Sequence, residues 1–256
     1  MGKINNKTFI ALWLFNPFLS GIYLFRNLKQ NTSILPYLLL SFFFGLSFVV
    51  STTGGDSVRY TAELVTYHQQ NISLSQVLNQ FYEDGNSTLD VYQPLVTWAV
   101  SIFTANTKVL FAIFALVFGY FWFKSLLIIR SNIDIPLKGL AGLAFLLLAL
   151  INPIWNINGV RMWTAVGIFF YGIILLYLQN SKRGWFFLIL PMFIHFSLII
   201  SLILYLLYRV IPSKNKTALL VLFIFTFFLG ELNLDVVREY FELLPGIIQT
   251  KQGYLG

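Results

Sequence analysis

Four short motifs hold the residues whose types and spacing suit chemistry, and each lies at the edge of an apolar run or inside one. Ionisable side chains at or within membrane spans are costly and are usually kept for function. These motifs supply carboxylates and an imidazole that could move protons, and guanidinium groups that could bind an anion. The motifs are Gly55-Asp56-Ser57-Val58-Arg59-Tyr60 with Glu63, Asp90-Val91-Tyr92-Gln93-Pro94-Leu95, Asn158-Gly159-Val160-Arg161 and Phe193-Ile194-His195-Phe196-Ser197.

The first motif predicts a helix with one polar and aromatic face. Asp56, Arg59, Tyr60, Glu63 and Tyr67 are spaced three or four residues apart and therefore share a face. Such a helix would present Asp56, Arg59 and Tyr60 to a cavity just above a membrane. The same spacing also fits a surface helix in which Asp56 caps the start and Arg59 pairs with Glu63.

The motif around Arg161 predicts an anion site. Arg161 enters the first turn of an apolar run and has no acidic neighbour in sequence. Its guanidinium fork matches phosphate or carboxylate, and the start of a helix adds free N–H groups and a positive dipole end. Alternatively, Arg161 extends to the membrane interface or pairs with Asp56 or Asp90.

The two remaining motifs offer an acidic group and an imidazole. Asp90 and Tyr92 precede a short apolar helix, and the simpler interpretation is a capping aspartate with an interfacial tyrosine. His195 lies in the middle of an apolar segment, where a neutral imidazole could accept a proton or bind a substrate hydroxyl. The simpler interpretation there is a buried histidine bonded to Ser197 or to backbone. The other histidine, His68, belongs to a polar stretch and is predicted to lie at the surface.

The elements that carry these motifs are predicted to be membrane helices. Of the 256 residues, 57% are hydrophobic and 11% are charged, whereas about 25% are charged in a typical soluble domain. We therefore expect an all-α, polytopic membrane protein with about six to eight membrane segments, short re-entrant ones included. The basic residues lie in short loops, so the net charge of +7 does not indicate nucleic acid. The absence of cysteine excludes disulfides and a cysteine nucleophile.

The chain is predicted to form a single membrane domain over residues 1–256. Residues 53–92 would form an extracytoplasmic loop with an amphipathic helix, and residues 233–256 an interfacial segment. The predicted apolar segments are Thr8–Phe25, Ile34–Thr52, Pro94–Ala105, Val109–Ile129, Leu137–Ile151, Arg161–Leu178, Trp185–Tyr208 and Ala218–Leu232.

Three of these segments are predicted to enter the membrane without crossing it. Pro94–Ala105 covers only about 18 Å as a helix, against a hydrocarbon core of about 30 Å. Trp185–Tyr208 has basic residues at both ends and would form a broken hairpin with His195 near its tip. Asn16-Pro17 interrupts Thr8–Phe25 in a similar way. The basic clusters then fall mostly inside, as cytoplasmic loops require, and the unusual polar residues all face the outer side.

The order of the motifs resembles the EpsG family of bacterial membrane proteins, which is related to Wzy-type polysaccharide polymerases. Gly-Asp-x-x-Arg-Tyr, acidic-x-Tyr-x-Pro-Leu, Asn-Gly-x-Arg and His-Phe-Ser follow one another over roughly residues 53–208. The family typically has Glu-Pro-Gly-Tyr in place of Asp90-Val91-Tyr92-Gln93, and Arg-Gln in place of Arg161-Met162. The second departure removes an amide that could hold substrate.

The resemblance implies a GT-C-like glycosyltransferase in the bacterial cytoplasmic membrane. Such polymerases join oligosaccharide repeat units carried on undecaprenyl diphosphate at the outer face, into exopolysaccharide, capsule or O-antigen. Membrane lipids and other polysaccharide-assembly proteins would be its partners, with no metal or cofactor. We expect catalysis by Arg161, His195, Asp56 and Asp90. We expect substrate binding by Arg59, Tyr60, Tyr92, Asn158 and Glu63.

Three other functions fit the same composition. A lipid-linked sugar flippase or exporter would need a polar path across the whole membrane, whereas the polar residues here gather toward one face. A membrane acyltransferase could use His195 with an Asn or Asp partner. A non-catalytic membrane subunit of a polysaccharide-assembly complex would need no reactive site.

Overall fold

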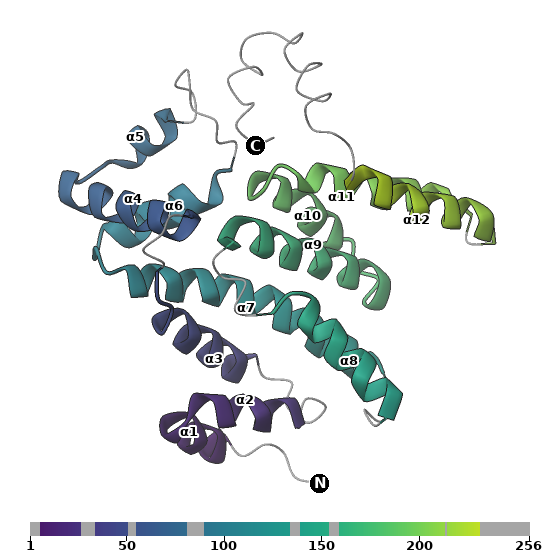
Figure 1. Ribbon diagram of the computed structural model, residues 1–256, viewed down its shortest axis with the longest axis horizontal. Coiled ribbons are helices and arrows are strands. Elements are labelled where there is room, and N and C mark those ends of the chain that lie inside the picture. The colour runs from purple at the N-terminus through teal and green to yellow at the C-terminus, as the bar shows by residue number, and fades with distance from the viewer. Residues whose placement is uncertain are drawn as a thin grey trace.

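The computed structural model describes residues 6–26, 34–50, 55–80, 90–133, 139–153, 159–212 and 214–230. Every regular element in these ranges is helical. Figure 1 shows the helices arranged as a stack, with the long helix α7 (Thr107–Asn132) through its middle. The predicted all-α class is therefore confirmed in the described part of the chain.

Helices α3 (Leu35–Leu46) and α9 (Val160–Leu178) lie on either side of α7 (Figure 1). Helix α3 runs antiparallel to α7, since Phe48 stacks on Phe111 and Tyr37 contacts Phe123. At Gly45 the two helices are so close that a Cβ would collide with the α7 backbone. This small residue therefore allows the close packing.

Helix α9 runs parallel to α7, because Val160 at its start lies in one cluster with Leu110 and Phe114, whereas Phe170 further along contacts Trp122 at a ring distance of 5.3 Å. Helices α7 and α9 consequently both begin at the same end of the stack. Helix α8 (Gly139–Ile151) provides the return between them, and Trp122 Nε1 donates to the Ala149 carbonyl near its end.

The predicted break around His195 is confirmed. Helix α10 (Gly184–Ile189) continues as the 3₁₀ helix η2 (Leu190–Phe193), and α11 (Leu198–Val210) begins only after a gap of irregular backbone. Pro191 lies in the 3₁₀ segment. Its ring fits poorly in a continuing α-helix, so it favours the break at this point.

Three short helices cover the end of the stack at which α7 and α9 begin. They are α4 (Asp56–Gln70), α5 (Leu74–Asn79) and α6 (Tyr92–Ser101), at the left of Figure 1. Asn71 ends α4 in the left-handed conformation with φ 48°. Ser73 and Gln76 form a capping box that starts α5. Helix α6 has ten residues and starts slightly earlier than the predicted segment, so it is as short as the sequence indicated.

The remaining helices follow the predicted segments. Helices α1 (Asn6–Phe15) and α2 (Pro17–Arg26) are separated at Asn16, which confirms the predicted interruption, and α12 is Lys216–Gly230. By length and composition, two described helices could cross a membrane, namely α7 and α9. The predicted segment 233–256 lies outside the described residues.

Candidate functional site

Helix α4 supplies one side of the site. It begins after Gly55, whose φ of +99° favours glycine, and Asp56 in the first turn is stabilised by the positive end of the helix dipole. Arg59 Nη2 lies 3.2 Å from Asp56 Oδ1, and Arg59 Nε lies 3.7 Å from Glu63 Oε1. The helix, its polar face and the Arg59–Glu63 pair are therefore as the sequence indicated, but the residue that caps the helix is Gly55 and not Asp56.

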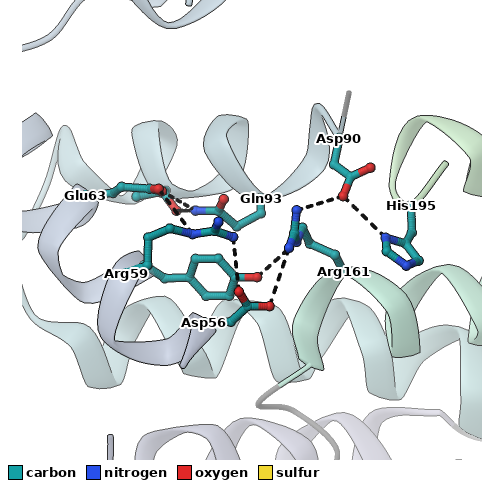
Figure 2. A network of polar contacts seen from close by, with 9 residues as sticks. Asp56, Arg59, Glu63, Asp90, Gln93, Arg161 and His195 are labelled. Carbon is teal, nitrogen blue, oxygen red and sulfur yellow. Dashed lines mark hydrogen bonds and ion pairs between the residues drawn. The ribbon is translucent and has the colours of Figure 1, made fainter. Parts of the chain in front are cut away.

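Arg161 lies in the first turn of α9 and joins α4 to the segment before α6 (Figure 2). Its Nη1 donates to Asp90 Oδ2 at 2.9 Å, its Nε to the Tyr60 hydroxyl at 3.1 Å, and its Nη2 to Asp56 Oδ2 at 3.5 Å. The Arg161 side chain is only 16% exposed. Arg161 thus pairs with Asp56 and Asp90 at once. Pairing with one of these aspartates was among the alternatives that the sequence left open.

Asp90 is the most buried charged group of the site, with 1% of its side chain exposed. Besides Arg161, its Oδ2 lies 3.3 Å from His195 Nδ1, and its Oδ1 accepts from the Phe196 N–H at 3.2 Å. The Val91 N–H donates to the Phe193 carbonyl at 2.9 Å. A buried carboxylate needs such partners. Asp90 therefore fastens the start of α6 to the break between η2 and α11.

His195 lies on that break, and its side chain is 20% exposed. An imidazole whose Nδ1–H donates to a carboxylate presents Nε2 as the acceptor nitrogen. In that tautomer, His195 could take a proton through Nε2. The predicted contact with Ser197 or backbone is replaced by the contact with Asp90.

The model of the EpsG family matches residues 32–254, nearly the whole chain. The chain belongs to the EpsG family. The resemblance read from the four motifs is thereby confirmed. No curated protein and no solved structure matches the chain. Membership of the EpsG family, together with the two long apolar helices, indicates a membrane protein connected with polysaccharide synthesis.

Gln93 is a residue of this EpsG chain that sequence reasoning did not place in the site. It is buried on α6, and its Nε2 donates to Glu63 Oε2 at 2.7 Å and to Thr97 Oγ1 at 3.0 Å. Gln93 and Thr97 are four residues apart on one face of an apolar helix. The spacing of this pair in the sequence could have indicated that Gln93 contacts the site, because polar side chains inside an apolar helix need polar partners.

The two tyrosines predicted to bind substrate both pack against Phe114, in one apolar cluster. The Tyr60 side chain is fully buried, and this burial raises the pKa of its hydroxyl to about 12, although Arg161 opposes the rise. Tyr60 therefore stays neutral at physiological pH and holds Arg161. The Tyr92 ring packs against Phe114, within the apolar cluster around α7.

The two remaining positions singled out in the sequence are Asn158 and His68. Asn158 lies outside the described residues, so its predicted role in substrate binding stays a prediction. The surface assignment of His68 was wrong. His68 is half-buried, and its Nδ1 lies within hydrogen-bond distance of the Ser101 carbonyl, because α4 packs on α6.

Within the described part of this EpsG chain, no group of three or more His, Asp and Glu side chains is arranged to hold a metal ion. The site itself consists of charged and titratable side chains. It has two guanidinium groups for an anion, one imidazole for a proton, and three carboxylates that orient them.

Proposed function

We propose that this EpsG-family chain is a membrane glycosyltransferase that polymerises oligosaccharide repeat units carried on undecaprenyl diphosphate. The reaction would take place at the outer face of the bacterial cytoplasmic membrane, where the polar end of a multi-pass, GT-C-like bundle would open to water. The observation that carries the proposal is the meeting of Arg161, Asp90 and His195 from three separate segments at one end of the stack.

The proposed reaction is a displacement at the anomeric carbon of the donor sugar. A hydroxyl oxygen of the acceptor saccharide forms the new C–O bond, and the bond between the anomeric carbon and the lipid diphosphate breaks. The hydroxyl proton passes to His195 Nε2, and the lipid diphosphate leaves with the bonding electron pair. Preorganised cations aimed at the departing charge are the largest effect available to such a site.

Arg161 is the group proposed to hold the departing diphosphate. It stands in the first turn of α9, where helix N–H groups and the dipole add to its charge. Arg59, which is 44% exposed, would be the second cation. Tyr60 would hold Arg161 in place. The saccharide would be bound by Tyr92, Asn158 and Glu63.

Among the three candidate bases, His195 has the geometry for the role. Both oxygens of Asp90 are taken by donors and its side chain is buried, so Asp90 is better suited to orient His195 and Arg161 than to meet substrate. Asp56 lies between the two arginines. A histidine oriented by a carboxylate is an effective general base near neutral pH.

The test is complementation of a strain that lacks the gene with the wild-type chain or with Arg161→Ala. The variant should insert into the membrane but give no polymer, and lipid-linked single repeat units should accumulate outside. Normal polymer from this variant would refute the proposed role of Arg161. A loss of lipid-linked units from the outer face would indicate a flippase instead.

A further inference from the structure

We infer that Asp56 occupies the anion subsite between Arg59 and Arg161, and that a diphosphate must displace its carboxylate in order to bind. This inference deepens the proposed function and rests on it. It makes Asp56 an internal competitor of the ligand, in place of the catalytic role that the sequence suggested.

The Asp56 carboxylate lies between two guanidinium groups. Its Oδ1 lies 3.2 Å from Arg59 Nη2, and its Oδ2 lies 3.5 Å from Arg161 Nη2. Each oxygen thus faces a different guanidinium group, as Figure 2 shows. Two oxygens of a phosphate group could bridge the same pair of donors, since guanidinium groups bind carboxylate and phosphate in similar ways.

The cluster around Asp56 contains more carboxylates than guanidinium groups. The two guanidinium groups of Arg59 and Arg161 face the carboxylates of Asp56, Glu63 and Asp90. With all these groups ionised and His195 neutral, the cluster carries a formal charge of −1. A diphosphate would be repelled by this cluster unless one carboxylate gave up its place.

Of the three carboxylates, that of Asp56 is the one held least firmly in its place. Asp90 is buried and has donors on both oxygens, and Glu63 accepts a hydrogen bond from the buried Gln93 amide. Asp56 is 38% exposed, which is more than either of them, and sits at the very start of α4 after Gly55. Water can solvate its carboxylate after displacement, so its departure costs less than that of the others.

The test is to measure binding of inorganic diphosphate to the purified full chain in nanodiscs, with farnesyl diphosphate as a second probe that carries a prenyl tail. Asp56→Asn keeps the shape of the side chain and removes the competing charge. We expect it to bind both probes about tenfold more tightly than wild type, or ~1.4 kcal/mol. Asp56→Glu keeps the charge and should bind close to wild type.

Glu63→Gln is the matched control, because it removes a carboxylate from the same cluster. Among the described residues, Glu63 contacts one guanidinium group, whereas Asp56 contacts two. Neutralisation of Glu63 should therefore give a clearly smaller gain. An equal gain would mean that any lost negative charge suffices. Unchanged binding by Asp56→Asn would mean that Asp56 does not compete with the ligand, and weaker binding would mean that it assists the ligand. Each of these results overturns the inference.

Arg161→Gln separates this inference from the proposed function. If wild type binds diphosphate and Arg161→Gln does not, the proposed diphosphate site stands, and only the Asp56 variants decide the inference. If neither wild type nor Asp56→Asn binds either probe, both the proposed site and the inference fail.

Discussion

Arg161 and Asp90 are 71 residues apart in the sequence, and their side chains form an ion pair of 2.9 Å at the junction of α9 with the segment before α6. Because Asp90 also contacts His195 and the Phe196 N–H, this one pair couples the proposed anion-binding group to the proposed base.

Replacement of Arg161 by lysine should abolish most polymer synthesis although the positive charge is kept. Arg161 uses three different nitrogens for Asp90, Tyr60 and Asp56, and one ammonium group cannot hold three partners at these positions. We expect activity to fall at least about tenfold. The free energy of unfolding should also fall, but by less than the about 3–5 kcal/mol that is typical when one partner of a buried ion pair is removed. Polymer yield and thermal unfolding of the purified protein measure the two effects. Arg209→Lys, at the exposed end of α11, is the matched control and should change neither.

Loss of the imidazole should slow the reaction without preventing membrane insertion. We expect His195→Ala to lower the turnover rate by about 10²- to 10⁴-fold, the usual range for removal of a general base. His68→Ala provides the control for a histidine outside the site. The same rate with His195→Ala as with wild type would remove His195 from the mechanism.

Asp90 and His195 should behave as one unit in a double-mutant cycle. Once His195 is replaced, Asp90→Asn should cost less turnover than it does in the wild-type chain, because Asp90 acts in part through the imidazole. Turnover of the two single variants and the double variant gives the coupling. Strictly additive effects would contradict the positioning role of Asp90.

The hydrogen bond between Gln93 and Glu63 should contribute to the stability of α6 against α4. Gln93→Leu would leave the Glu63 carboxylate without its buried donor, at a cost of about 1–3 kcal/mol. Gln69→Leu on the exposed side of α4 is the matched control and should change stability little. Chemical unfolding of both variants in the same detergent measures the difference.

Tyr60 should make the protein sensitive to alkali. Burial raises the pKa of its hydroxyl from 10.0 to about 12, so the folded state favours the protonated form more than the unfolded state does. This contribution is complete below pH 10 and is lost as the pH rises toward about 12.

The measurement is stability as a function of pH for wild type and Tyr60→Phe. The wild-type chain should lose more stability over this interval than the variant does. Burial raises the pKa of Tyr67 to about 12 as well, so part of the alkaline loss should persist in Tyr60→Phe. Identical pH profiles would mean that Tyr60 does not titrate with folding.

The sequence by itself determined most of the helices, their breaks and the charged residues of the site. These features can be recognised from short stretches of sequence, because hydropathy and helical periodicity extend over a few turns. They are the apolar runs, the Asn16-Pro17 pair and the polar residues around His195. The same periodicity predicted the shared face of Asp56, Arg59 and Glu63 on α4, which the structure has.

Only the tertiary structure decided which of these residues meet. Arg161 lies 105 residues from Asp56, and His195 lies 105 residues from Asp90. The choice among their possible partners depends on the parallel packing of α9 beside α7, the docking of α6 on the η2–α11 break and the burial of Gln93. Hydropathy and helix period carry no information about such distant contacts, because an ion pair depends on where whole helices come to rest against one another.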